Sequence, residues 1–370
     1  MQRSSERVLT THTGSLPRPF DLPASGASPG RLSEAVVAVV RSQLEAGVDV
    51  VNDGEVSKPS YVTYVTERLA GFGGTGRPLA PKDAEDFPEW AEKLFADPSL
   101  IEALRSPACV EPIIYRDTTA VDRDIANLKA ATDGTGATEA FLSAASPGVI
   151  ALFLENKHYA SDEEYLAALA DAMKTEYDAI HRAGLVLQLD CPDLAMGWNV
   201  AELGGTKEQF LKEVALRVEA INDATRDIPP EQMRLHLCWG NYEGPHHRDI
   251  ALREILTEVL RARPAAISFE GANPRHEHEW RVFEDVRLPE EKALIPGVID
   301  STTNYIEHPE LVAQRIVRYA ELVGRENVLA GTDCGFATFA AFVPVDPKIT
   351  WAKLGALSEG AELATKRLFG

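Results

Sequence analysis

The chain alternates between short, nearly continuous apolar runs and longer stretches in which apolar residues recur at helical spacing. Eight short runs are each followed by a turn, and they span residues 8–11, 48–52, 140–145, 185–190, 234–239, 266–270, 295–300 and 328–332. Runs of this length without polar interruption are typical of parallel strands that are covered on both faces. We therefore expect eight short buried strands.

The stretches between these runs predict helices over residues 32–46, 161–183, 311–322 and 351–368. In the first stretch, five apolar side chains fall on one helical face: Ala35, Val36, Val39, Val40 and Leu44. Ser161 and Glu164 have the spacing of a capping box, and Gly184 supplies a stop at the other end of that helix.

Eight strands that alternate with helices favour a closed (β/α)8 TIM barrel, an α/β fold, with a doubly wound open sheet as the main rival. The 370 residues exceed the roughly 250 typical of that barrel. Residues 71–108 are rich in Gly, Pro, Asp and Glu, and residues 109–116 add an apolar run that breaks the alternation. We interpret 71–116 as an insertion near the barrel mouth, a candidate lid, within one catalytic domain that spans residues 1–370.

Charge and cysteine content narrow the setting of the protein. The chain has 57 acidic and 37 basic side chains, a formal net charge of −20, which argues against a broad nucleic-acid or anionic-membrane surface. Four cysteines in so long a chain make no disulfide framework. The first residues are polar, unlike a signal peptide, and no apolar run reaches membrane-spanning length. We expect a soluble protein in the reducing cytoplasm.

The residues at the carboxyl ends of the predicted strands carry the chemistry. In chain order they are Gly14 and Ser15, Asp53 and Glu55, Ser146, Asp190, His236 and Cys238, Glu270, Asp300, and Asp333 and Cys334. A (β/α)8 barrel gathers its reacting groups at this end of the strands. We therefore expect these side chains to converge on one mouth.

Four of these residues form a candidate metal site. His236 and Cys238 are two residues apart in a predicted strand and so share its inward face, Glu270 ends the next strand, and Cys334 follows the last one. Imidazole, thiolate and carboxylate together suit tetrahedral Zn²⁺, whereas an isolated buried cysteine is more often a small apolar residue. Zinc with two thiolate ligands favours activation of a substrate thiol for S-alkylation over hydrolysis by bound water.

These residues resemble the motifs of the cobalamin-independent methionine synthases, and specifically the single-domain proteins that correspond to the C-terminal catalytic half of that enzyme. The matching segments include Asn52-Asp53-Gly54-Glu55, Leu187-Gln188-Leu189-Asp190, His236-Leu237-Cys238, Ser268-Phe269-Glu270 and Thr332-Asp333-Cys334-Gly335. The resemblance covers most of the chain in order. It implies a (β/α)8 barrel and Zn²⁺ bound by His236, Cys238, Glu270 and Cys334.

The resemblance also implies a site for an amino-acid thiol. Gly14 and Ser15 would bind the carboxylate of homocysteine, while Glu55 and Asp190 would act as catalytic and substrate-binding carboxylates that hold its ammonium group. For Glu55 or Asp190 alone, a helix cap or a structural ion pair is an equally good interpretation.

The methyl-donor side departs from the family pattern. Met196 stands where a pterin-binding glutamate is expected, and Thr302 where a proton-donating histidine is expected. Ala108 replaces the arginine of an Arg-Cys pair, and Phe153 stands in the place of a stacking tryptophan. Loss of the proton donor together with the pterin contact puts methyltetrahydrofolate in doubt as the donor.

A related enzyme of similar length, epoxyalkane:coenzyme M transferase, offers an alternative: alkylation of a sulfonate thiol, or C–S lyase chemistry. A sulfonate needs cationic neighbours, for which Arg18 and Lys58 are candidates, although we interpret both as surface residues. Two histidine pairs, His246-His247 and His276-Glu277-His278, are interpreted as solvated loops.

The leading hypothesis is a zinc-dependent S-methyl- or alkyltransferase that acts on a small-molecule thiol with a methyl or alkyl donor. The default reaction is that of 5-methyltetrahydropteroyltriglutamate–homocysteine methyltransferase. A non-catalytic zinc- or thiol-binding protein and a zinc hydrolase are the alternatives. The sequence leaves the donor open, and also whether the protein is a homo-oligomer.

Overall fold

The computed structural model describes the whole chain except residues 20–21, 24, 98–100, 102–103, 201–204 and 341–342. Its central sheet has seven parallel strands in the order β1-β4-β5-β6-β7-β8-β9. The strands are β1 (Val50–Val51), β4 (Glu139–Ala145), β5 (Val186–Asp190), β6 (Met233–His236), β7 (Ala266–Phe269), β8 (Ala293–Ile299) and β9 (Gly331–Thr332). They coincide with seven of the eight predicted runs.

The first predicted run closes the sheet into a barrel. Thr10 forms a parallel bridge with Ala330 next to β9, and the Thr11 amide donates to the Ala330 carbonyl at 2.9 Å. On its other side, Thr10 accepts a hydrogen bond from the amide of Val50 in β1 at 3.0 Å. A segment that pairs with both the first and last strands leaves no open edge, which excludes the open-sheet rival. The prediction of a (β/α)8 TIM barrel is confirmed.

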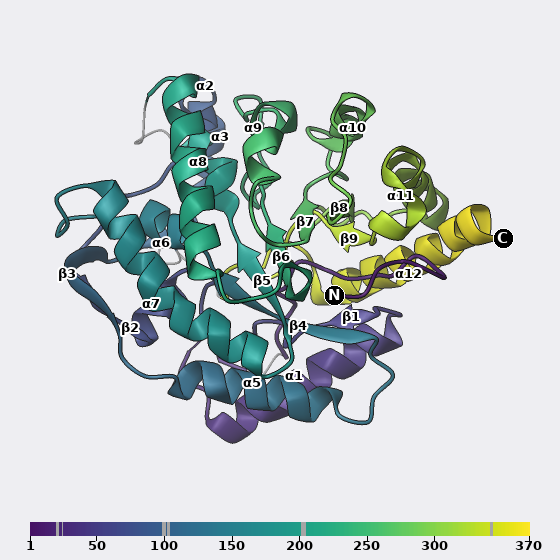
Figure 1. Cartoon of the computed structure of the whole chain (residues 1–370), viewed down its shortest axis with the longest axis horizontal. Coiled ribbons are helices and arrows are strands. Elements are labelled where there is room, and N and C mark those ends of the chain that lie inside the picture. The colour runs from purple at the N-terminus through teal and green to yellow at the C-terminus, as the bar shows by residue number, and fades with distance from the viewer. Residues whose placement is uncertain (20–21, 24, 98–100, 102–103, 201–204, 341–342) are drawn as a thin grey trace.

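Helices surround the sheet (Figure 1). The longer ones are α1 (Pro29–Glu45), α5 (Thr119–Thr132), α6 (Pro147–Phe153), α7 (Asp162–Arg182), α8 (Lys207–Ala224), α9 (Leu252–Val259), α11 (Pro309–Val323) and α12 (Pro347–Phe369), and α10 (Val282–Asp285) is a single turn. The Ser161 hydroxyl caps α7 by accepting from the Glu164 amide, and Gly184 follows the helix at φ +80°. No helix in the described ranges is long and apolar enough to cross a membrane.

The predicted insertion contains a separate antiparallel hairpin, β2 (Leu69–Gly73) and β3 (Ala108–Tyr115), with α2 (Asp83–Asp86) and α3 (Pro88–Leu94) between its strands. The hairpin begins two residues before the predicted boundary at 71. Its connecting segment lies against the barrel, because Pro81 bridges to Val200 and Arg248 pairs with Asp86. The organisation as one domain plus an insertion, and a role of the insertion as a lid, stay predictions.

A buried polar network inside the barrel positions the first segment. Arg234 in β6 is 1% exposed and lies 3.5 Å from the centroid of the Phe141 ring. Its guanidinium donates to the Thr11 hydroxyl at 2.9 Å, to the His12 carbonyl at 2.6 Å and to Gln188. Gln188 in turn donates to Asp190 at 2.7 Å. The network ties the segment that carries Gly14 and Ser15 to the strands that carry Asp190 and His236.

Candidate functional site

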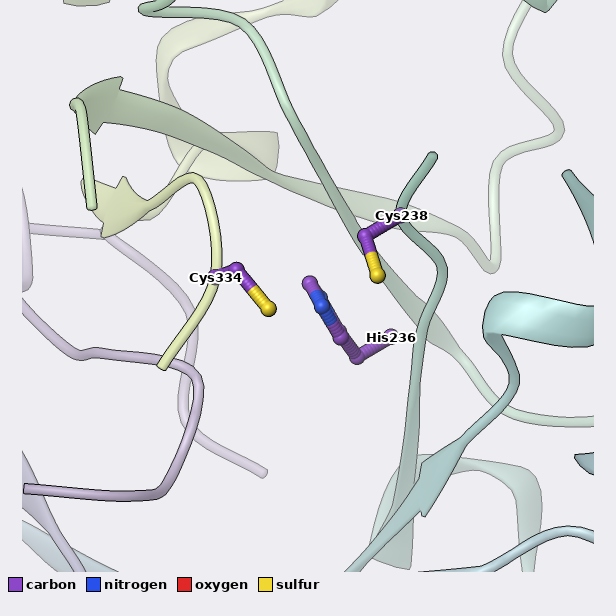
Figure 2. A group of neighbouring side chains, drawn as sticks. All are labelled: His236, Cys238 and Cys334. Atoms are coloured by element: carbon purple, nitrogen blue, oxygen red, sulfur yellow. The ribbon is translucent and has the colours of Figure 1, made fainter. Parts of the chain in front are cut away.

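A cluster of one imidazole and two thiols lies at the carboxyl end of the barrel strands (Figure 2). His236 is the last residue of β6, Cys238 follows it by two positions, and Cys334 comes two residues after β9. The potential ligand atoms of these three residues all lie within 4.8 Å of one another, and the side chains are buried. Cys238 was predicted to lie within a strand, which is wrong, because β6 ends at His236, two residues before Cys238.

The imidazole is oriented for a ligand. Nδ1 of His236 lies 3.1 Å from the Ser268 hydroxyl of β7, which fixes the ring. Its other nitrogen, Nε2, is buried and has no hydrogen-bond partner among the described residues. A buried polar atom without a partner costs free energy unless a ligand binds it. An oriented imidazole beside two thiols is a donor set that zinc prefers, so the residues present fit this metal.

The two thiols share a proton unequally. A hydrogen bond from Cys334 lowers the pKa of Cys238 well below its ordinary value of 9.0, although burial opposes this effect. The same hydrogen bond, together with burial, raises the pKa of Cys334. Cys238 is therefore poised as the first thiolate of the pair, as a metal ligand needs to be.

Glu270, the fourth predicted ligand, lies next to β7 but outside the close cluster. Its Oε1 accepts from the Trp239 amide at 2.7 Å, and its Oε2 accepts from the Asn273 side chain at 2.7 Å. Burial, and then the charge of Cys238, raise the pKa of Glu270 well above 4.5. The role of Glu270 as a metal ligand stays a prediction.

Asp333 organises the loops that carry these groups. One carboxylate oxygen accepts from the amides of Gly271 and Ala272, both at 2.8 Å, and the other accepts from the Asn273 amide at 2.8 Å. The sequence placed Asp333 at a strand end but indicated no function for it. The structure shows that it joins the loop after β9, which carries Cys334, to the loop after β7, which carries Glu270.

Four residues predicted to bind the thiol substrate lie around the same space. Ser15, Glu55 and Asp190 line a cavity of about 310 Å³ together with the imidazole and both thiols. Gly14 lies against Glu55, because a Cβ on Gly14 would come within 2.6 Å of Glu55 Oε1. Glu55 itself has φ +56°, a left-handed conformation that is rare without glycine and that clusters at functional sites.

Asp190 shares this space with a second carboxylate. Burial, and then the negative charge of Glu55, raise its pKa to about 7, while His236 and Lys58 oppose the rise. Two carboxylates that line one buried cavity attract a proton or a cation.

Lys58 was interpreted as a surface residue, and this is wrong. The side chain is 8% exposed, and its Nζ lies 3.6 Å from Glu55 Oε1. The ammonium also donates to the Ser143 carbonyl at 2.7 Å, and the Ser143 hydroxyl donates to Glu55. Arg18 is half-buried and donates to the carbonyl of Lys58. Because Glu55 and Lys58 meet in a turn outside any helix, no helical charge pattern marked this pair in the sequence.

The prediction of solvated histidine loops is also wrong for His246 and His276. His276 is 2% exposed and stacks on Trp239 with ring centroids 3.9 Å apart. The Asp249 carboxylate lies 2.8 Å from His246 and 3.1 Å from His276. These ion pairs raise the pKa of both histidines against the effect of burial, which for His246 gives a value of about 9. They stabilise the loop that carries Cys238 and Trp239.

The outer part of the cavity is apolar. Its walls include Leu79, Leu94 and Phe95 from the insertion, Phe153 from the end of α6, and Phe339 from the loop after β9. Met196, one of the departures noted on the donor side, also lines it, whereas Thr302 donates its hydroxyl to Asp300 at 2.9 Å.

Comparison with known proteins connects this geometry to a family. Residues 87–345 match the family model described as "Cobalamin-independent synthase, Catalytic domain". The chain belongs to this family. Among its relatives are the methionine synthases of Saccharolobus solfataricus, 26% identical, and Thermococcus kodakarensis, 24% identical. Each alignment covers 97% of this chain, and 95% and 94% of the respective relative.

Solved structures of related synthases share the fold. A B12-independent methionine synthase from Shewanella sp. W3-18-1, in complex with selenomethionine, superposes with a TM-score of 0.76 at 21% identity and covers 98% of this chain and 99% of that one. A putative B12-independent methionine synthase from Listeria monocytogenes gives a TM-score of 0.65 at 18% identity, over 98% of this chain and 99% of that one. The chain is therefore a methionine-synthase-like member of the cobalamin-independent family.

Proposed function

We propose that the protein is a zinc-dependent S-methyl- or alkyltransferase whose acceptor is a small amino-acid thiol, with homocysteine as the default. The observation that carries the proposal is the buried cluster of His236, Cys238 and Cys334 beside the carboxylates of Glu55 and Asp190. Thiol-binding and cation-binding groups thus share one cavity. The relatives named methionine synthase support the same reaction class.

His236, Cys238 and Cys334 would hold the zinc ion, with Glu270 as a fourth ligand that is free to yield to the substrate thiol. When bound, zinc lowers the pKa of a coordinated thiol, so that the sulfur is a nucleophilic thiolate at neutral pH. The Ser268 hydroxyl fixes the imidazole, and the buried surroundings exclude water that would compete with the thiol.

The carboxylates would position the substrate. Asp190 and Glu55 hold the ammonium group of the thiol, and Gly14 and Ser15 bind its carboxylate. Lys58 and Ser143 already occupy one oxygen of Glu55, which keeps that carboxylate oriented. Because Lys58 is committed to Glu55 and Ser143, the pocket favours an amine-bearing thiol over the sulfonate thiol of the epoxyalkane:coenzyme M transferase and C–S lyase alternatives.

The donor is a methyl or alkyl compound that fits the apolar outer chamber, and a simplified folate remains one candidate. The partners are thus two small molecules, and a reducing cytoplasmic setting, which keeps the thiols free, is part of the proposal. A non-catalytic zinc- or thiol-binding protein is the alternative to be excluded.

The test compares zinc content, homocysteine binding and methyl transfer in the wild type, a Cys334→Ser variant and a Cys109→Ala control. Cys109 is also buried, but it lies in β3 and is not among the residues that line the cavity. We expect near-stoichiometric zinc in the wild type and the control, and loss of both zinc and activity, by at least about 100-fold, in Cys334→Ser. A wild type that binds zinc and thiol, but for which none of the donors tested yields an alkylated thiol, would support the non-catalytic alternative instead.

A further inference from the structure

Tyr61 lies on the wall that joins the thiol cluster to the apolar chamber. It lines the cavity together with Cys238 and Cys334. Its segment is held to the loop after β9, because Ser60 forms an antiparallel bridge with Phe339 and the Ala340 amide donates to the Pro59 carbonyl at 2.9 Å. The segments that carry Tyr61 and Cys334 are thereby fixed to each other.

The ring and the proton of Tyr61 are both constrained. The ring packs edge-on against Phe153 with centroids 5.9 Å apart, and lies 6.3 Å from the Phe339 ring. Burial, and then the negative charges of Cys238 and Cys334, raise the pKa of the phenol well above 10.0. The hydroxyl therefore keeps its proton at neutral pH, on a side chain that lines the same cavity as the two thiols.

Several other side-chain donors of the cavity are engaged with the protein, while the Ser15 and Thr338 hydroxyls each accept a hydrogen bond, from the Ala337 amide and the Asn241 side chain. Asn199 donates to Asp249, Trp239 to the Ile250 carbonyl, Asn241 to the Gly335 carbonyl, Tyr242 to Asp83, and Thr13 to the Thr332 carbonyl. Within the described part of the chain, the Tyr61 hydroxyl forms no hydrogen bond. An uncommitted hydroxyl in a largely apolar cavity is available to a bound molecule.

We propose that Tyr61 is a catalytic residue that protonates the leaving atom of the alkyl donor. This inference rests on the proposed function. The bound thiol has given its proton to solvent, and a lone pair of its thiolate sulfur forms the new S–C bond, while the bond between that carbon and the leaving oxygen or nitrogen breaks with its electron pair on the leaving atom. That atom takes the phenol proton, and solvent returns a proton to the tyrosinate after product release. The donor is thus a compound that has a basic leaving atom and that binds in the apolar part of the cavity.

The experiment compares donors that need a proton with one that does not. Homocysteine is alkylated with 1,2-epoxypropane and with 5-methyltetrahydrofolate, whose leaving oxygen or nitrogen must be protonated, and with methyl iodide, whose leaving iodide needs no proton. Tyr61→Phe should lower the rate at least about 100-fold with a donor that needs the proton, and leave the methyl iodide rate within about twofold. Tyr64→Phe serves as the control, since that hydroxyl donates to Asp124 outside the cavity.

Three results would overturn the role of Tyr61: equal losses with every donor, no loss with any donor, or a wild type that reacts with methyl iodide alone. The ratio of the epoxypropane rate to the methyl iodide rate adds a second readout. It should stay flat from pH 6 to 9 if Tyr61 is the proton donor, whereas protonation by Asp190 would make it fall above a pKa of about 7. Zinc content and homocysteine binding of the same preparations report separately on the proposed function.

Discussion

The two halves of the cavity are built in different ways. The thiol half consists of groups at strand ends, namely His236, Cys238, Cys334, Glu55 and Asp190, and neighbouring strands or loops hold most of them by hydrogen bonds. The donor half consists of apolar side chains from the insertion and from long loops, with few polar groups that could fix a ligand. A rigid, polar half specifies one acceptor closely, whereas an apolar half selects by shape alone and is free to change donors.

Among the substitutions that test this difference between the two halves, Asp190→Asn should cause the largest change in homocysteine affinity. Removal of a buried charge that faces an ammonium group should weaken homocysteine binding about 100-fold, since hydrogen bonds between charged groups contribute roughly 2–3 kcal/mol. Calorimetry with homocysteine and with its amine-free analogue, 4-mercaptobutanoate, measures the two affinities. If the substitution weakens binding of both ligands equally, Asp190 does not bind the ammonium group.

Acidification should produce the next largest effect. Asp190 has a pKa raised to about 7, so lowering the pH through that value protonates the carboxyl group while the substrate amine stays charged. The attraction is therefore present above the pKa and lost below it, and affinity should fall by up to about tenfold per pH unit. Methionine, which has no thiol to titrate, is the ligand for this measurement. The same pH dependence in Asp190→Asn would assign it to another group.

Gly14→Ala tests how tightly the thiol half is packed. The added Cβ would lie 2.6 Å from Glu55 Oε1 and 3.3 Å from the Ser143 hydroxyl, so Glu55 has to move. We expect about a fivefold loss of homocysteine affinity, or about 1 kcal/mol, with little change in zinc content. Gly30→Ala in α1, where a Cβ meets nothing within 4 Å, is the matched control. Unchanged affinity in Gly14→Ala would mean that the position of Glu55 is not critical.

A substitution in the donor half should have the smallest effect on homocysteine binding in the thiol half. Leu94→Ala in α3 removes part of the apolar wall, so it should change the KM for the donor while homocysteine affinity stays within about twofold. Steady-state kinetics with each substrate varied in turn separate the two. A larger loss of homocysteine affinity would show that the halves are not independent.

The sequence predicted the barrel well because buried parallel strands form nearly continuous apolar runs. β5 and β7 begin or end within one residue of their predicted bounds, and α7 ends beside Gly184 as expected. The first strand was recognisable as a run of four residues, although Thr10 is the residue that forms the bridge. The β2–β3 hairpin was not predicted because its strands are separated by a long segment that masks their pairing.

The residues of the candidate site that lie at strand ends could be predicted from the sequence. They are His236, Asp190 and the loop that bears Cys334. What the sequence did not reveal depends on contacts between distant segments. The burial of Lys58 beside Ser143, and of His276 beside Asp249, arises from pairing across 85 and 27 residues respectively, for which a local pattern gives no signal.

The most direct test of the central claim is zinc K-edge X-ray absorption of the purified protein before and after homocysteine is added. We predict zinc bound by one imidazole and the two sulfurs of Cys238 and Cys334, with one further sulfur ligand when homocysteine binds. Zinc whose sulfur coordination is unchanged by homocysteine, or protein that binds no zinc, would contradict this claim.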